Sequence, residues 1–91
     1  MKTLLEPGDM IRIRKDIKED MSYKMIFNSD SSNSYIKHMA KPGELIKIRT
    51  ITTFGQYKIE SKTSKYAELW DYTDEMFDPE SIQLILENKN L

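Results

Sequence analysis

The sequence predicts an all-β fold, a small barrel of about five strands with one or two short helical turns. Three observations support this prediction. A turn-and-strand segment occurs twice, further segments alternate apolar and polar side chains as strands do, and only two stretches favour a helical turn. The chain has 91 residues, of which 38% are hydrophobic and 32% charged. That length and composition predict a single domain over residues 1–91 with one small core.

The repeated segment comprises residues 7–14 and residues 42–49. The first reads Pro-Gly-Asp-Met-Ile-Arg-Ile-Arg and the second Pro-Gly-Glu-Leu-Ile-Lys-Ile-Arg, so the two match in character throughout. In each copy a Pro-Gly turn precedes a strand whose side chains point alternately to opposite faces. The isoleucines are expected to face the core. The outward positions belong to four basic residues, Arg12, Arg14, Lys47 and Arg49.

A hairpin is predicted over residues 44–61. The first arm, 44–53, is rich in β-branched side chains, and the second arm, 57–60, alternates apolar and polar residues. Residues 54–56, with glycine at the centre, make the tight connection between them.

Two further strands complete the prediction. Residues 66–72 contain Tyr66, Leu69, Trp70 and Tyr72 and follow a polar loop at 61–65. Residues 82–86 are a short apolar run that follows a proline and precedes a polar tail at 87–91. Both runs are read as strands because of their length and composition.

Helix and loop account for the rest of the chain. Ser34 is a candidate N-cap for a short helix over 35–40, and Thr73 is a candidate N-cap for a single turn over 74–77. Residues 24–34 are rich in Ser, Asn and Asp and are predicted to form a flexible loop. The whole stretch 15–34 is the least regular part of the sequence, and a loop of that length in so small a domain is either functional or disordered.

Composition excludes several classes of function. The chain has no cysteine and one histidine, His38, which excludes disulfides, thiol nucleophiles and the common zinc sites. No apolar run is long enough for a membrane span or a signal peptide, so we expect a cytoplasmic protein without membrane association. Glycine-rich phosphate loops and catalytic Ser/His spacings are absent from the sequence. We therefore expect no cofactor, no metal and no enzymatic activity.

Charge is balanced overall but unevenly placed. The formal net charge is −1, yet residues 1–50 sum to +3 and residues 51–91 to −4. The acidic excess is concentrated between residues 68 and 80, where no Lys or Arg occurs. Two of its acids, Asp74 and Glu75, also suit the start of a short helix, an interpretation we prefer to a cation site. Such a block repels phosphate and attracts basic surfaces, although a solvated face is the simpler interpretation.

The order of features over residues 8–79 resembles that of a known group of proteins. The resemblance rests on the Gly-Asp strand at 8–16, on the downstream positions Tyr23, His38, Met39, Gly43, Tyr57 and Ile59, and above all on the run Trp-Asp-Tyr-Thr-Asp-Glu-Met-Phe at 70–77. The group consists of small SH3-like barrel proteins encoded by phages, prophages and mobile elements of Gram-positive bacteria. Membership would imply an SH3-like barrel. It would also imply a role in host takeover or counter-defence by binding and blocking another protein.

Protein binding is the function that the residues favour. Aromatic side chains alternate with carboxylates near the acidic block, as in an interface for a basic partner surface. The predicted contacts are Trp70, Asp71, Tyr72, Asp74, Glu75 and Asp78. The partner would be a host or defence protein, inhibited by a surface that imitates nucleic acid. The alternative is that Trp70 and Phe77 close the bottom of the barrel, so that only the acids are exposed.

Nucleic-acid binding by the basic strand face is the second hypothesis. Phosphate contacts would come from Arg12, Arg14, Lys47 and Arg49, and a stacking surface from Tyr57 or Phe54. The pI near 5.8 argues against this hypothesis, because such proteins usually present a strongly basic footprint.

Overall fold

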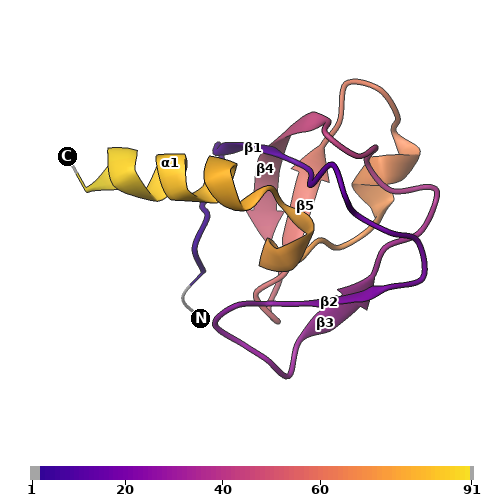
Figure 1. Cartoon of the computed structure of the whole chain (residues 1–91), viewed down its shortest axis with the longest axis horizontal. Coiled ribbons are helices and arrows are strands. Elements are labelled where there is room, and N and C mark those ends of the chain that lie inside the picture. The colour runs from indigo at the N-terminus through magenta and orange to yellow at the C-terminus, as the bar shows by residue number, and fades with distance from the viewer. Residues whose placement is uncertain (1–2, 91) are drawn as a thin grey trace.

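The structure is a computed structural model that describes residues 3–90 of the chain. It is mainly β, with two small antiparallel sheets, one α-helix and two short 3-10 turns (Figure 1). The elements in chain order are β1 (Met10–Arg12), β2 (Ser22–Lys24), β3 (Ser32–Ser34), β4 (Leu45–Ile51), β5 (Tyr57–Glu60), η1 (Tyr66–Leu69), η2 (Asp74–Met76) and α1 (Pro79–Lys89). The larger sheet has the order β1-β4-β5, and the smaller one is the hairpin β2-β3.

The two copies of the repeat pair with each other as β1 and β4. Ile11 of the first copy lies opposite Ile46 of the second, which is the equivalent residue. The N–H of Gly8 donates to the carbonyl of Ile48 at 2.8 Å, and the equivalent N–H of Gly43 donates to the carbonyl of Ile13 at 3.0 Å. The repeat is therefore a pseudo-two-fold pair centred on the two isoleucines.

The turns before the two strands are built alike. Both glycines have a positive φ, 96° for Gly8 and 78° for Gly43, which side chains other than glycine rarely adopt. In each turn the acid after the glycine accepts a hydrogen bond from a backbone N–H three residues earlier. Asp9 accepts from Glu6 at 2.7 Å, and Glu44 accepts from Lys41 at 3.1 Å.

The core lies on the inner face of the three-stranded sheet. Alternation along β1, β4 and β5 places one face of each strand inward, as the sequence predicted. Phe77 packs between two tyrosine rings, with centroid distances of 5.6 Å to Tyr57 and 6.4 Å to Tyr72. The residues with at most 1% exposure are Leu5, Ile11, Ile13, Ala40, Ile46, Ile48, Tyr57, Ile59, Ala67, Tyr72, Thr73, Asp74, Met76 and Phe77.

The strands do not close into a barrel. Between β5 and β1 the chain crosses as residues 72–77, which include η2. Two isolated bridges join this segment to the sheet, Tyr72 with Tyr57 and Phe77 with Ile13. The predicted strand over 66–72 is wrong, because 66–69 forms the 3-10 turn η1 instead. A 3-10 turn places side chains at a spacing of three and interrupts strand pairing.

The predicted strand over 82–86 is also wrong, because this run lies in helix α1. Asp78 is its N-cap and accepts a hydrogen bond from the N–H of Ser81 at 3.1 Å, and Pro79 follows at the first helical position. Ile82 is buried against the core, while the helix projects beyond the sheets on the left of Figure 1. The ammonium of Lys89 contacts Asp9 at 2.7 Å and secures its far end.

Residues 15–40 contain the second sheet. The range 24–34, predicted as a flexible loop, includes the end of β2, a turn and all of β3. The predicted helix over 35–40 is wrong, because these residues are irregular with a single turn. Tyr35 is buried there and donates its hydroxyl to the carbonyl of Ala40 at 3.0 Å.

The predicted turn after Thr73 is confirmed as η2, although the Thr73 side chain makes no capping bond.

Candidate functional site on the outer face of the sheet

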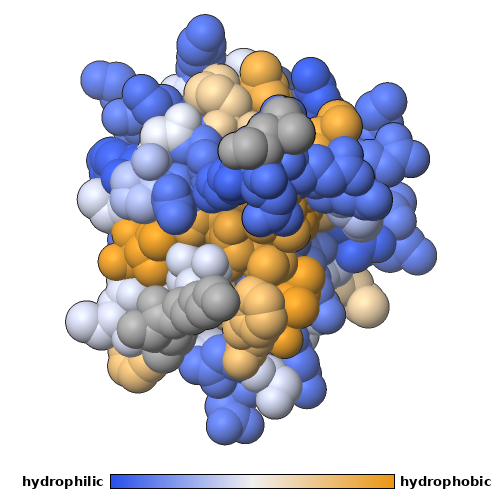
Figure 2. All heavy atoms as spheres, turned by 90° about the vertical axis from the view of Figure 1, so that its left-hand side faces the viewer, coloured by the Kyte–Doolittle hydropathy of each residue, from blue (hydrophilic) through white to orange (hydrophobic). Residues whose placement is uncertain are grey.

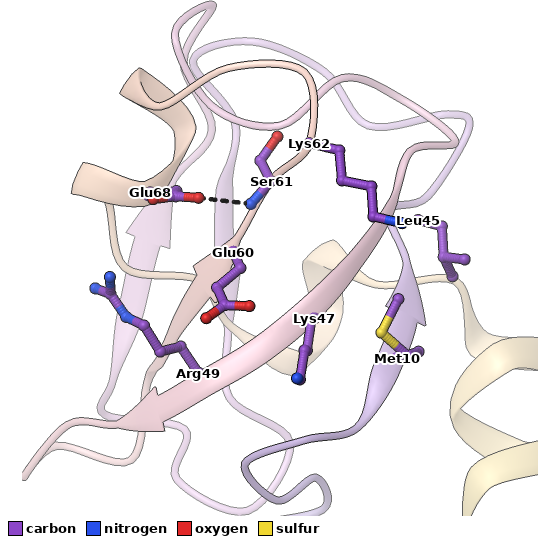
Figure 3. A pocket seen from close by; sticks show the side chains of 8 residues that line it. All are labelled: Met10, Leu45, Lys47, Arg49, Glu60, Ser61, Lys62 and Glu68. Carbon is purple, nitrogen blue, oxygen red and sulfur yellow. Dashed lines mark hydrogen bonds between the residues drawn. The ribbon is translucent and has the colours of Figure 1, made fainter.

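The outer face of the three-stranded sheet is concave and mixed in charge. Met10 of β1 lies opposite Lys47 of β4, which in turn lies opposite Glu60 of β5, and all three side chains are exposed. These side chains surround a cavity of about 540 Å³ (Figure 3). Its lining consists of Met10, Leu45, Lys47, Arg49, Glu60, Ser61, Lys62 and Glu68.

Three cations line this cavity and have no partner in the part of the chain that the structure describes. Within residues 3–90, Lys47, Arg49 and Lys62 make no ion pair and their side chains make no hydrogen bond. Of the two carboxylates, Glu68 is engaged, because it accepts the N–H of Ser61 at 2.9 Å. The positive side chains therefore have their donors free, as a site for an anionic ligand requires.

A bulge in β4 directs one of the cations. The pairing of β4 with β5 changes register between Ile48 and Thr50, so Arg49 stands at the irregularity. Bulges of this kind bend a strand and re-aim the side chain that they contain. In Figure 3 the guanidinium of Arg49 lies on the same side of the sheet as the Glu60 carboxylate and the Lys47 ammonium.

The loop that supplies the third cation is anchored to the sheet. Glu44, at the start of β4, accepts hydrogen bonds from the hydroxyls of Ser61 and Thr63, the latter at 2.8 Å. Lys62 lies between these two residues. Its backbone is therefore held by contacts on both sides, and its flexible side chain extends into the cavity from a fixed base (Figure 3).

Two of the predicted partner contacts lie in the core. Tyr72 and Asp74 are 0% exposed. The hydroxyl of Tyr72 donates to the carbonyl of Ala67 at 2.7 Å and accepts from the N–H of Ala40 at 2.8 Å, which satisfies it inside the fold. Asp74 accepts from the hydroxyl of Tyr57 at 2.6 Å. Neither side chain is available to a partner in this structure.

The other acids are held by partners within the chain. Asp71 contacts the ammonium of Lys58 at 2.6 Å, Asp78 caps α1, and Glu75 accepts the N–H of Lys24 at 2.7 Å. The acidic block is thus distributed over three elements.

Trp70 is the predicted contact that remains at the surface beside other apolar side chains. It is 38% exposed, and its neighbours in η1, Tyr66 and Leu69, are 69% and 66% exposed. Phe77, in contrast, is 1% exposed. The alternative that Trp70 and Phe77 both lie in the core therefore holds for Phe77 only.

Of the residues predicted to bind nucleic acid, some line the cavity and others are engaged or buried elsewhere. Lys47 and Arg49 line the cavity, whereas Arg12 donates to the carbonyl of Gly43 at 2.7 Å. Arg14 forms two bonds of 2.9 Å to Asp16, which raises the pKa of the guanidinium and lowers that of the carboxyl. Tyr57, predicted to stack on bases, is 0% exposed.

Sequence reasoning singled out Lys47 and Arg49 and missed the other six residues that line the cavity. Met10 and Leu45 each lie two positions before a basic residue of the same strand, Arg12 and Lys47. Alternation alone could therefore have placed them on the outer face. Lys62 lies in a loop, and its approach to the sheet depends on the contacts of Glu44. Local sequence carries no signal for that approach.

Burial raises the pKa of side chains inside the core, among them those of Tyr57, Tyr72 and Asp74. Burial raises the pKa of the Tyr57 hydroxyl, and its hydrogen bond to Asp74 raises it further. Burial also raises the pKa of the Asp74 carboxyl, against the opposing effect of the hydrogen bonds from Tyr57 and from the N–H of Ile26. Burial likewise raises the pKa of Tyr72.

The described residues offer neither a cluster for a metal ion nor a membrane-spanning helix. Among the residues that the structure describes, no three His, Asp or Glu side chains come together in an arrangement that would hold a metal ion. Over the same residues, no helix has the length and apolar character needed to cross a bilayer.

Comparisons with known proteins give no relative. A scan against models of protein families, a search of curated proteins and a search of solved structures each found no match to this chain.

Proposed function

We propose that this chain is a non-enzymatic binding module that takes an acidic segment of a partner protein on the outer face of its three-stranded sheet. One observation supports this most directly: three cations that have no partner among residues 3–90, Lys47, Arg49 and Lys62, line one concave cavity. Their charged groups are solvated on an open face. That arrangement is typical of a recognition surface rather than of a rigid catalytic constellation.

The remainder of the lining favours a protein over a nucleic acid. Met10 and Leu45, 42% and 45% exposed, offer apolar contacts beside the cations. Single strands are usually bound by stacking on aromatic rings, and the lining contains none. A polypeptide with spaced acidic and apolar side chains fits this pattern better.

Within this proposal the partner is a host or defence protein. The resemblance to phage-type SH3-like proteins supports that setting in the bacterial cytoplasm, where binding would inhibit the partner. Nucleic acid is the second candidate, since the same three cations would contact phosphates. A partner with a basic surface, held by the acidic block, has weaker support because Tyr72 and Asp74 are buried.

The test is binding of a fluorescent peptide of alternating glutamate and leucine, followed by anisotropy at about 0.1 M salt. Reversing two charges in the variant Lys47→Glu/Arg49→Glu should weaken binding by about tenfold or more, because like charges then face each other. The matched control is Lys18→Glu/Lys37→Glu, which changes the net charge equally at exposed positions outside the cavity.

The control variant should bind within about twofold of wild type, since distant charges are screened at a Debye length of about 10 Å. Equal losses in both variants would reject a local site. A labelled oligothymidylate serves as competitor probe. Tighter binding of the oligonucleotide than of the peptide would transfer the proposal to nucleic acid.

A further inference from the structure

A second cavity lies on another side of the molecule, between α1, η2 and the segment before β1. Its volume is about 400 Å³, within the range of small-molecule sites. Figure 2 shows an apolar band across this side of the molecule, bordered above and below by hydrophilic residues. The apolar side chains that line the cavity are Leu4, Ile26, Phe77, Pro79, Ile82 and Leu86.

Polar groups line the cavity where η2 begins. Asp74 belongs to the lining although it is 0% exposed, and one of its carboxylate oxygens is bonded to Tyr57. Its second oxygen has only a long bond of 3.4 Å from the N–H of Ile26. The neighbouring Glu75 is exposed and accepts the N–H of Lys24 through one oxygen, and its other oxygen has no partner among residues 3–90.

The cation in this lining is already neutralised. Arg14 pairs with Asp16 through two nitrogens and donates a third hydrogen bond to the carbonyl of Glu75 at 3.1 Å. Acceptor capacity thus exceeds donor capacity at this end of the cavity. A ligand that matches the lining has an apolar body and a positively charged donor at one end.

We propose that this cavity binds a small hydrophobic amine, with its apolar body against α1 and its ammonium group at Glu75, in front of Asp74. A carboxylate ligand is disfavoured because two acids stand at the polar end and the only guanidinium is paired. The amine also leaves the sheet-face site unoccupied, since the two cavities share no lining residue.

The experiment uses three probes of equal chain length, n-hexylamine, n-hexanol and n-hexanoate, titrated into the full ¹⁵N-labelled chain at neutral pH. Backbone NMR signals of Leu4, Ile26 and Ile82 should shift on binding. The amine should bind about fivefold tighter than the alcohol, as expected for one partly exposed ion pair, and the hexanoate weakest. Absence of shifts at these residues, or hexanoate binding as tightly as the amine, would overturn the proposal.

Two variants separate the roles of charge and shape. Glu75→Gln should reduce amine affinity to that of hexanol, whereas Glu80→Gln, an exposed α1 control outside this cavity, should keep the preference. Leu86→Trp should fill the cavity and abolish binding of all three probes, with an otherwise preserved spectrum. The sheet-face variant Lys47→Glu/Arg49→Glu should bind the amine as wild type does. A failure of the peptide-binding proposal is therefore distinguished from a failure of the amine-binding proposal. Retained preference in Glu75→Gln would contradict the assignment.

Discussion

The hydroxyl of Tyr57 donates a hydrogen bond of 2.6 Å to a carboxylate oxygen of Asp74, and neither residue exposes any surface. Tyr57 belongs to β5 and Asp74 to η2, so the bond joins the sheet to the segment that crosses beneath it. The same hydroxyl accepts from the N–H of Leu5 at 3.3 Å, and the second carboxylate oxygen accepts from Ile26. Four segments distant in sequence therefore meet at one buried polar pair.

Removing the hydroxyl should destabilise the fold. Tyr57→Phe leaves the Asp74 carboxylate without its shortest donor in a buried site, at a cost of about 2 kcal/mol in the free energy of unfolding. Urea denaturation measures the change. Tyr66→Phe is the control at an exposed hydroxyl and should change stability by less than about 0.5 kcal/mol. A similar small effect at both positions would show that the buried bond contributes little.

Stability should also depend on pH through Asp74. Burial, reinforced by Glu75, raises the pKa of this carboxyl above its ordinary value, so the native state binds a proton more tightly than the unfolded chain does. The stabilisation that comes from protonated Asp74 is fully present below the pKa of the unfolded state. It is lost as pH rises through the pKa of the folded state. The stability of wild type relative to Asp74→Asn should therefore fall as pH rises above 3.8, the ordinary pKa of an aspartate. A constant or rising difference across urea titrations at several pH values would contradict the shift.

Thr73 offers a stabilising substitution. It is 0% exposed, and its hydroxyl has no hydrogen-bond partner among residues 3–90. Thr73→Val keeps the shape and the extended backbone preference while removing the unsatisfied hydroxyl. We expect a gain of about 1 kcal/mol. Thr53→Val, at an exposed position, should leave the melting temperature unchanged, and a loss of stability in Thr73→Val would point to a partner for its hydroxyl.

The pseudo-two-fold pair predicts equal effects at its two glycines. Gly8→Ala and Gly43→Ala each force a side chain into a positive φ, at a cost of about 1–2 kcal/mol. The surroundings add little, because an added Cβ meets no atom within 4 Å at Gly8 and only a Lys15 side-chain carbon, at 3.5 Å, at Gly43. Chemical denaturation of both variants should give similar losses. A large loss at one glycine alone would contradict the equivalence.

The parts of the fold that the sequence predicted depend on local signals. The Pro-Gly turns and alternating isoleucines identified β1 and β4 with the correct inward faces, and Gly55 marked the turn before β5. The pairing of the two repeats with each other could not be read from either copy. It depends on long-range hydrogen bonds such as that between Gly8 and Ile48.

The errors arose where one pattern suits two structures. The run at 82–86 has the length of a strand, and the helical spacing of Ile82, Ile85 and Leu86 becomes visible only with the Asp78 cap. In 70–77 aromatic and acidic residues alternate, which predicted an interface. Burial of Tyr72 and Asp74 depends on partners from β5 and from residue 40, which lie far away in sequence.

Two of the eight residues that line the candidate site were predicted from the sequence. Lys47 and Arg49 were placed outward by alternation, and they line the cavity. Tyr57 lies opposite Ile51 of β4 and its side chain points inward from β5. It is therefore not exposed for the predicted stacking role. Lys62 enters through a loop whose position is fixed by tertiary contacts with Glu44.

The most direct test of the central claim maps where the acidic peptide binds. Backbone NMR signals of the ¹⁵N-labelled chain are followed while the unlabelled glutamate-leucine peptide is added at low salt. The proposed site predicts the largest shifts at Met10, Lys47, Arg49 and Lys62, all of which should diminish as salt is raised. Shifts centred instead on Tyr66, Leu69 and Trp70, with the sheet face unchanged, would contradict it.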